Sequence, residues 1–374
     1  MKILLLCNYQ PNNAAMVTDH INSFSLYSKH EVKVCSCLVK NRGNFCHKTF
    51  CFDDFDVIVI HYSLFLMHDH YISEKTRIEL KNFQGVKCIF LQDEYNFVNK
   101  TVEYIAQINF DIIFTCVPEG AIEKVYPSTK LFKTKCVNVL TGYVPLSLVN
   151  HDTITLRNRK FDISYRGRLY PLWYGRIGLE KWQIVPKILK TTKCFGLKCN
   201  ISYQEKDRLY GDHWVNLLKN SIAVLGTESG ASVFDFTGDI YNMINVYEKL
   251  LEKKIPLWKK LFRKEKVLIE QYNHLKKKYF IELEDKIQYA QISPRVFEAM
   301  ALRTLCILYE GEYSGILVPW RHYIPLKKDH SNISDVVSII KNQTAATEII
   351  MNAYKEIILN SKYSYKNFVN MIDS

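Results

Sequence analysis

The stretch "SPRVFEAMALRTLCILYEGEYSG" (293–315) predicts a short helix, a buried strand and a glycine-containing loop, in that order. Pro294 after a serine is typical of a helix start. The apolar run "TLCILYE" (304–310) is typical of a strand that is covered on both faces. Glu298 lies among the apolar residues of the helix. It either interacts with the helix macrodipole near the N-terminus or accepts hydrogen bonds from a ligand at that terminus.

The same alternation of strands and helices recurs along the whole chain. Short apolar runs without clean alternation indicate strands buried on both faces, and amphipathic or polar stretches separate them. Repeated β–α units of this length predict an α/β protein with doubly wound parallel sheets. The predicted strands are 2–9, 31–39, 56–62, 86–92 and 110–117, followed by 161–167, 199–203, 221–226, 304–310 and 322–326.

The length of 374 residues favours two domains. The polar stretch "NHDTITLRNRK" (150–160) separates the two sets of strands, so we predict domains at 1–150 and 151–374. A helical insertion at about 238–285 interrupts the second domain. Ligands of such sheets bind beyond the carboxyl ends of the strands.

Basic residues are concentrated in one segment. The chain has a net charge of +12, and residues 248–280 hold eleven Lys or Arg against four Glu. This distribution indicates a local basic surface, so we expect no nucleic-acid partner. Three interpretations of the segment stay open: a helix in peripheral contact with an anionic membrane, a lid over a ligand, or a solvated hairpin.

Composition and motifs also bear on location and metals. Eleven scattered cysteines without zinc-ligand spacing indicate reduced thiols. The sequence contains no run of eighteen or more apolar residues, so we expect no transmembrane helix. We therefore expect a cytoplasmic protein, at most peripheral at the inner face of the membrane. The motifs "HDH" (68–70) and "DDFD" (53–56) stand alone or precede a strand, so we expect no metal and no cofactor.

A basic stretch, "YRGRLYPLWYGRIGLEK" (165–181), follows the first strand of the second domain. Arg166, Arg168 and Lys181 carry positive charge, and Gly167 permits close approach of the backbone. Such a turn is suited to a diphosphate, with further N–H donors from the following helix start. A solvated basic loop is the structural alternative.

Another strand of this domain ends in "LGTESGASVFDF" (225–236). Glu228, Ser229 and Gly230 place a carboxylate, a hydroxyl and exposed backbone at the strand end. A binding site and a structural turn explain this pattern about equally well.

The stretch 293–315 resembles the nucleotide-sugar signature of GT-B glycosyltransferases, particularly the glycosyltransferase group 1 superfamily and its spore-maturation-protein-like branch. The "EAM" step at 298–300 matches the one with which these enzymes hold the ribose of the donor. "GRL" (167–169) with Lys181 is similar to their phosphate-binding Arg and Lys, at longer spacing. The resemblance implies two Rossmann-like domains facing across a cleft, with the nucleotide sugar on the second.

In one position the chain departs from this family. The superfamily often has a first Glu eight positions before the ribose-binding one, where this chain has Ala290. We predict that the paired acids are split in sequence, with Glu228 taking the first position in space. The backbone of "GEYSG" (311–315) is the alternative for orienting the donor. The predicted donor-binding residues are Arg166, Gly167, Glu228, Ser229, Gly230, Arg295, Glu298, Tyr313, Ser314 and Gly315.

The resemblance places the acceptor on the first domain. Asp19 and His20 are the predicted general base, since a histidine accepts a hydroxyl proton near neutral pH. An ordinary helix start is the alternative. The end of the fourth strand offers a second candidate base. The predicted acceptor-side residues are His61, Tyr62, Asp93 and Glu94.

The sequence thus predicts a glycosyltransferase that moves a sugar from a nucleotide-diphosphate sugar to a glycan or lipid-linked saccharide. Arg168 and Lys181 would neutralise the leaving diphosphate. A sugar-nucleotide epimerase or hydrolase on the same fold and a non-catalytic polyanion-binding protein are the alternatives.

Overall fold

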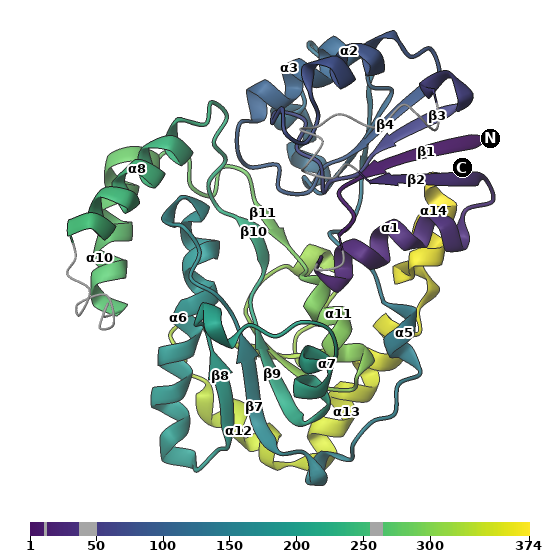
Figure 1. Cartoon of the computed structure of the whole chain (residues 1–374). Coiled ribbons are helices and arrows are strands. Elements are labelled where there is room, and N and C mark those ends of the chain that lie inside the picture. The colour runs from purple at the N-terminus through teal and green to yellow at the C-terminus, as the bar shows by residue number, and fades with distance from the viewer. Residues whose placement is uncertain (11–12, 37–50, 255–264) are drawn as a thin grey trace. The chain divides into compact units, whose positions relative to one another are not determined.

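A computed structural model of the chain describes residues 1–10, 13–36, 51–254 and 265–374. The chain divides into two compact units (Figure 1). Unit 1 comprises Met1–Tyr143 and Ser361–Ser374, and unit 2 comprises Val144–Asn360. The prediction of an α/β protein with two doubly wound parallel sheets is confirmed.

Unit 1 is built on a six-stranded sheet of order β2-β1-β3-β4-β5-β6, in which all neighbouring strands are parallel. Its strands are β1 (Lys2–Cys7), β2 (Glu31–Ser36), β3 (Val57–Ile60), β4 (Val86–Phe90), β5 (Ile112–Thr115) and β6 (Lys135–Asn138). Its helices are α1 (Ala15–Tyr27), α2 (Glu74–Asn82), α3 (Val98–Ile108), α4 (Ile122–Val125) and α14 (Tyr365–Ile372).

Unit 2 is built on a five-stranded parallel sheet of order β13-β12-β9-β7-β8, with a separate antiparallel pair of β10 and β11. Its strands are β7 (Phe161–Arg166), β8 (Cys199–Ser202), β9 (Ser221–Gly226), β10 (Ser229–Ala231), β11 (Tyr289–Gln291), β12 (Leu305–Tyr309) and β13 (Ile324–Leu326). Its helices are α5 (Leu146–Val149), α6 (Gly175–Thr192), α7 (Gly211–Lys219), α8 (Asp239–Lys254), α10 (Glu265–Leu275), α11 (Pro294–Ala301), α12 (Ile333–Lys341) and α13 (Gln343–Ala353).

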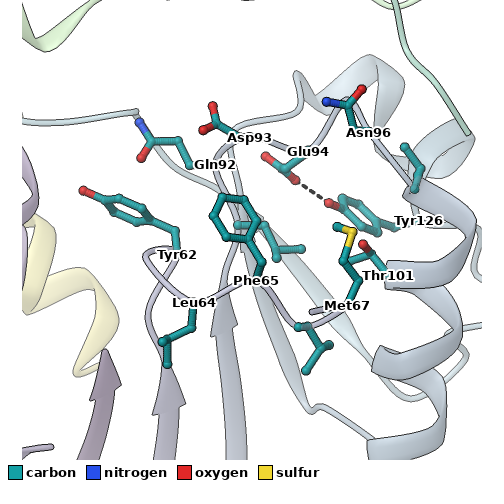
Figure 2. A pocket seen from close by; sticks show the side chains of 13 residues that line it. Tyr62, Leu64, Phe65, Met67, Gln92, Asp93, Glu94, Asn96, Thr101 and Tyr126 are labelled. Atoms are coloured by element: carbon teal, nitrogen blue, oxygen red, sulfur yellow. Dashed lines mark hydrogen bonds between the residues drawn. The ribbon is translucent and has the colours of Figure 1, made fainter. Parts of the chain in front are cut away.

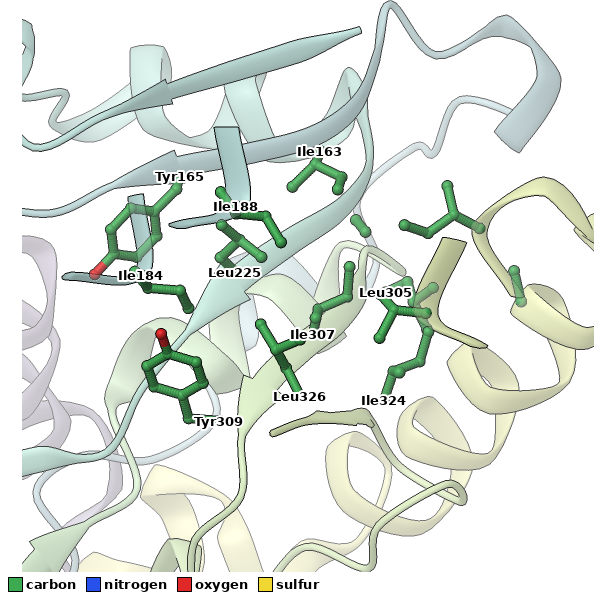
Figure 3. Packing of buried hydrophobic residues seen from close by; sticks show 14 of the residues in the cluster. Ile163, Tyr165, Ile184, Ile188, Leu225, Leu305, Ile307, Tyr309, Ile324 and Leu326 are labelled. Carbon is green, nitrogen blue, oxygen red and sulfur yellow. The ribbon is translucent and has the colours of Figure 1, made fainter. Parts of the chain in front are cut away.

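The packing of the core of unit 2 explains why the sequences of its strands are continuous apolar runs. Alternate residues of each strand pack on one face against α6, α12 and α13 (Figure 3). On the other face α7 packs on β9 and α11 on β12. Because both faces are covered, both sets of side chains are apolar or small. The sheet residues of the first face are Ile163, Tyr165, Ala223, Leu225, Leu305, Ile307, Tyr309, Ile324 and Leu326.

Both sheets have a topological switch point, where the chain turns to the opposite side of its first strand. In unit 1 this point lies between β1 and β3, and in unit 2 between β7 and β9. Ligands of open α/β sheets bind outside the carboxyl ends of the strands at such points. The two candidate sites are therefore the strand ends of β1 and β3 and those of β7 and β9.

The boundaries of the units differ from the predicted 1–150 and 151–374. Residues 144–150 belong to unit 2, and the last helix, α14, packs on α1 of unit 1. The Phe368 ring lies 4.9 Å from that of His20, and the Asp373 carboxylate accepts hydrogen bonds from the Ser28 hydroxyl and the Lys29 backbone N–H. The apolar face of α14 therefore belongs to the core of unit 1. The position of this helix at the end of the chain does not reveal that.

Three short strands, β6, β10 and β11, were not predicted, because they contain few β-forming residues. The end of the predicted strand 31–39 and the middle of the helical insertion, 255–264, lie outside the described residues. The described flanks of that insertion are α8 and α10. In the part of the chain that the structure describes, no helix is long and apolar enough to cross a membrane.

Candidate functional site

The switch point of unit 2 begins at Gly167, directly after β7. A Cβ atom at this position would lie 2.7 Å from the Tyr165 ring and 2.9 Å from the backbone oxygen of Lys181. Any larger residue would push α6 away from the strand. Gly167 therefore lets the start of the loop and the helix lie close to each other, and the predicted approach of its backbone to a diphosphate stays a prediction.

Two cations from separate segments lie against the ring of Tyr170. The Arg168 guanidinium carbon lies 4.3 Å and the Lys181 Nζ 5.1 Å from the ring centroid. Burial would raise the pKa of Tyr170, but the charges of Lys181 and Arg168, with a smaller effect of Arg295, outweigh it and lower that pKa. Lys181 also donates a hydrogen bond of 3.3 Å to the Ser229 hydroxyl. The strand ends of unit 2 thus form a positively charged site suited to an anion.

Arg166 was predicted to contact the ligand, but its guanidinium lies against the neighbouring strand. It donates to the backbone oxygens of Tyr165 and Asn200 and to Asn200 Oδ1, at 2.7–2.9 Å. Burial lowers its pKa. Arg166 therefore holds the ends of β7 and β8 together.

The N-terminus of α6 was predicted to offer N–H groups to a diphosphate. Instead the Arg176 backbone N–H donates to Glu284 Oε1 at 2.8 Å. Ser232 and Tyr272 donate to the same carboxylate through their hydroxyls, and Lys276 forms an ion pair with it. Burial would raise the pKa of Glu284, but Lys276 and these donors lower it. An internal carboxylate thus occupies the Arg176 N–H at the start of the helix. A contact of a diphosphate with the other N–H groups of that turn stays a prediction, and the side chains of Arg168 and Lys181 supply positive charge nearby.

Glu228 holds the loop after β12. Its Oε1 accepts hydrogen bonds from the backbone N–H groups of Glu312, at 2.8 Å, and Tyr313, at 2.9 Å. Burial raises the pKa of Glu228, and these two donors oppose that shift. The two predicted alternatives for orienting a donor, the acid and the loop 311–315, are therefore parts of one structure.

The loop itself has an unusual backbone. Tyr313, Ser314 and Gly315 have φ values of 45°, 57° and 68°, in the left-handed region. The Ser314 hydroxyl accepts from the Ile292 N–H at 3.1 Å and donates to Gln291 Oε1 at 2.9 Å. Left-handed non-glycine residues cost free energy and are concentrated at functional sites.

The strand pairing of unit 2 bears on the predicted split of the paired acids, which stays a prediction. Gly230 pairs with Ala290, and Ser229 with Gln291. The segment that follows Glu228 therefore runs beside the position where the family often has its first acid. Gly230 has a φ of 107°, and a Cβ there would collide with the Tyr289 backbone oxygen.

Glu298 lies in the second turn of α11, whose first turn contains no acidic residue. The helix-start interpretation is therefore wrong. Trp214 of α7 donates from Nε1 to Glu298 Oε2 at 2.7 Å. The Arg295 guanidinium lies 5.0 Å from the Trp214 ring and donates to the Arg166 backbone oxygen. Trp214 was not predicted, because a single tryptophan in a helix is usually a core residue.

In unit 1, His20 is only 2% exposed and lies inside an aromatic core. The Ser63 backbone N–H donates to His61 Nδ1, so neutral His61 carries its proton on Nε2 and donates it to His20 Nδ1 at 3.0 Å. Burial lowers the pKa of His20 to about 3 and that of His61 well below its usual value. So weak and enclosed a base does not serve an acceptor hydroxyl, and the predicted role of His20 is wrong.

Asp19, Tyr62 and Asp93 are brought together at the strand ends of unit 1. Burial raises the pKa of Tyr62, and the nearby charges of Tyr365, Cys116, Asp93 and Asp19 add to this shift. Burial also raises the pKa of Asp19. Asp93 is exposed, and its Oδ1 accepts a hydrogen bond from the Tyr95 hydroxyl at 2.8 Å.

Glu94, in contrast, points into unit 1. Its carboxylate accepts hydrogen bonds from the Thr115 hydroxyl and the Cys116 backbone N–H. It also accepts one from the Tyr126 hydroxyl, which Figure 2 shows. A carboxylate held by three internal donors fixes the loop after β4. Of the two predicted acids of that loop, Asp93 is the one exposed to solvent.

Comparison with known proteins shows the fold. No protein-family model and no curated protein match the chain. Among solved structures, an alpha-glucosyltransferase in complex with UDP matches with a TM-score of 0.57, 11% identity and full coverage of both chains. The chain has the GT-B fold. Two further structures of an alpha-glucosyltransferase also match. One, with UDP and a 13-mer DNA containing an HMU base, has a TM-score of 0.58, 12% identity and coverage of 100% and 99%. The other, with UDP-glucose and DNA containing an abasic site, has a TM-score of 0.53, 11% identity and full coverage.

The GT-B part of the predicted resemblance is thus confirmed. The narrower resemblance to the spore-maturation-protein-like branch stays a prediction, and so do the ligand-binding roles of the site residues other than Arg166 and His20.

Proposed function

We propose that this chain is a glycosyltransferase that moves a hexosyl or related sugar from a nucleotide-diphosphate sugar to a hydroxyl group. Unit 2 would bind the donor and unit 1 the acceptor. The observation that carries the proposal is the convergence of Arg168 and Lys181 on the Tyr170 ring at the switch point of unit 2.

The chemistry of transfer requires such a cluster. Breaking the bond between sugar and diphosphate leaves extra negative charge on the leaving group. Arg168 and Lys181 are held in place by the Tyr170 ring before the ligand binds. Preorganised cations stabilise charge that develops in the transition state, because they need not reorganise during the reaction. Residual water in the site would lead to hydrolysis of the donor.

Acids complete the proposed donor site. In our proposal Glu298 accepts hydrogen bonds from the ribose hydroxyls, while Glu228 and the loop 311–315 orient the sugar end. The hydrogen bonds from Trp214 to Glu298 and from the loop to Glu228 fix each carboxylate on one side. We propose no metal and no cofactor, since protein cations provide the charge.

The similar structures suggest the donor and widen the choice of acceptor. They hold UDP or UDP-glucose, so a UDP-sugar is the first donor to test. Two of them also hold DNA, so the expected absence of a nucleic-acid partner has no support. A glycan or lipid-linked saccharide remains our proposed acceptor, and DNA is the second candidate, favoured by the net charge of +12.

Location follows from the same proposal. We propose a cytoplasmic enzyme, where nucleotide sugars are available. Peripheral contact with the inner face of the membrane through 248–280 rests partly on residues outside the described ranges.

A thermal-shift panel with UDP, GDP, CMP and ADP tests the donor. A ligand at 100 times its Kd stabilises the native state by roughly 2.7 kcal/mol. We expect one diphosphate to raise the Tm, and Arg168→Ala to reduce that shift. Arg157→Ala is the matched control, since Arg157 is an exposed arginine of the same unit.

The rival functions give different results. Rapid epimerisation, or sugar release as fast as transfer, would favour an epimerase or hydrolase. Salt-sensitive binding of nucleic acid without any nucleotide effect would favour a polyanion-binding protein. No Tm shift with any of the four nucleotides contradicts the proposed function.

A further inference from the structure

A pocket opens in unit 1 between the loops that follow β3 and β4. It is an open cleft whose outline spans about 430 Å³, including space that is continuous with solvent. Residues 62–67 form one wall, residues 91–96 the other, and the start of α3 closes one end. Figure 2 shows the Phe65 ring in the middle, with Asp93 and Glu94 on one side and Met67 on the other. The pocket lies at the carboxyl ends of the parallel strands, where ligands of such sheets bind.

The pocket combines an apolar floor with a polar rim. Leu64, Phe65 and Met67 provide the apolar surface. Gln92 and Asn96 contribute amide groups to the lining. The Gln92 Nε2 also donates to the Thr141 backbone oxygen at 3.2 Å, which orients this amide. Such a combination is suited to a ligand with one apolar face and several hydroxyl groups at its edge.

The charge of the lining is negative. Asp93 and Glu94 are its ionisable acids, and the lining residues that the structure describes include no Lys or Arg. Lys100 acts on the pKa of the nearby His68, and neither residue lines the pocket. A phosphate group needs cations or N–H donors for binding. The lining therefore disfavours an anionic ligand.

The walls are held in place by internal hydrogen bonds. Glu94 fixes the loop after β4 through its three donors. The Tyr95 hydroxyl donates to the Asp93 carboxylate and orients it. The centroids of the Phe65 and Tyr71 rings lie 5.3 Å apart. A pocket with a fixed aromatic face and an oriented carboxylate is preorganised for binding.

We infer that this pocket binds one neutral sugar ring of the acceptor, with its C–H face on Phe65 and its hydroxyls on Asp93, Gln92 and Asn96. The aromatic face carries partial negative charge that attracts C–H groups, and hydrogen bonds from hydroxyls to a carboxylate are stronger than neutral ones. The inference rests on the proposed function for its biological meaning. It names the acceptor class at this site as a neutral saccharide and excludes a nucleic acid there, because no cation of the lining would meet the phosphates.

Saturation-transfer NMR on the full chain tests the inference. The probes are methyl α- and β-glucopyranoside, methyl β-galactopyranoside, methyl N-acetyl-β-glucosaminide and glucose 6-phosphate. We expect at least one neutral glycoside to bind more tightly than glucose 6-phosphate. Phe65→Ala should weaken the binding of that glycoside about three- to tenfold. Asp93→Asn should also weaken it, and should reduce the ratio of its affinity to that of glucose 6-phosphate. Phe132→Ala is the matched control, since Phe132 is 78% exposed in the same unit.

Each outcome decides between the inference and its rivals. Absence of binding by every neutral glycoside, tighter binding of glucose 6-phosphate, or equal effects of Phe65→Ala and Phe132→Ala would overturn it. The UDP-induced Tm shift, measured on the same variants, keeps the proposed function separate. If UDP stabilises the protein but no glycoside binds, the saccharide pocket alone fails. If glycosides bind but UDP does not, the donor assignment fails and the pocket stands.

Discussion

The two units of this protein have nearly the same sheet and opposite chemistry at its strand ends. In both, the first strand lies inside the sheet, and the switch point adjoins it. Unit 2 gathers Arg168 and Lys181 around one tyrosine there. Unit 1 gathers Asp19 and Asp93 around another, Tyr62. Two sheets of similar topology therefore carry opposite charges at their switch points. Under the proposed function, these charges decide which unit binds the anionic donor and which binds the acceptor.

The largest expected effect concerns the cations of unit 2. Arg168→Ala and Lys181→Ala should each lower kcat for sugar transfer about 100- to 1,000-fold, as does the loss of one group that stabilises transition-state charge. Steady-state rates with a UDP-sugar measure this. Arg157→Ala should leave the rate unchanged. An equal loss of rate in the control would show that net charge, not the cluster, matters.

Acid should affect unit 1 more than unit 2. His20 and His61 are buried neutral in unit 1, with the pKa of His20 near 3, whereas His330 in unit 2 has a pKa of about 4. Below pH 6.5 the unfolded chain binds protons that the folded histidines do not bind. Stability is therefore lost as pH falls from about 6.5, by about 1.4 kcal/mol per pH unit for each such histidine.

Urea unfolding between pH 7 and 4.5 measures this effect. His20→Phe should reduce the slope of the unfolding free energy against pH. The unfolding free energy at pH 7.5 should change little. A parallel pH dependence in wild type and variant would contradict the assignment of a neutral, buried His20.

A glycine substitution tests how the backbone shapes the cationic site. Gly167→Ala should destabilise the protein by about 1–3 kcal/mol, because its Cβ would press on Tyr165 and on the Lys181 backbone. Gly120→Ala is the control, since its Cβ would meet no atom within 4 Å. Tm values of the two variants compare them. Equal Tm values would mean that α6 moves away from β7 without cost.

The smallest effect is expected at Glu298. Glu298→Gln should weaken nucleotide binding about tenfold, or 1.4 kcal/mol, because a neutral amide accepts ribose hydrogen bonds less strongly. Its Tm without ligand should change little, since Gln also accepts from Trp214. Calorimetric titration with UDP provides the affinity. A large loss of Tm with unchanged affinity would assign Glu298 to folding alone.

Sequence reasoning succeeded where local pattern and topology act together. Apolar runs located the main strands, and parallel strands bring their carboxyl ends to one edge, so Arg168, Lys181 and Glu228 were expected at the same edge. The pairing of Gly230 with Ala290 brings the segment after Glu228 beside the position where the family often has its first acid, while the pairing of the two acids stays a prediction.

It failed where a partner lies far away in the sequence. Glu284 caps α6 from 108 residues away, which no spacing around Arg176 reveals. His20 is buried partly by Phe368 of the last helix, so its pKa depends on residues that a reading of α1 alone leaves out. Trp214 is assigned to the candidate site because of its hydrogen bond to Glu298, which the sequence does not reveal.

The most direct test of the donor assignment compares the affinities of UDP and uridine, by calorimetric titration, for the wild-type chain and for Arg168→Ala/Lys181→Ala. We predict that the wild type binds UDP at least about 100-fold more tightly than uridine, since in our proposal Arg168 and Lys181 contact the diphosphate. In the double variant this ratio should approach one. A ratio that is equally large in both proteins would contradict the account, because the diphosphate would then bind elsewhere.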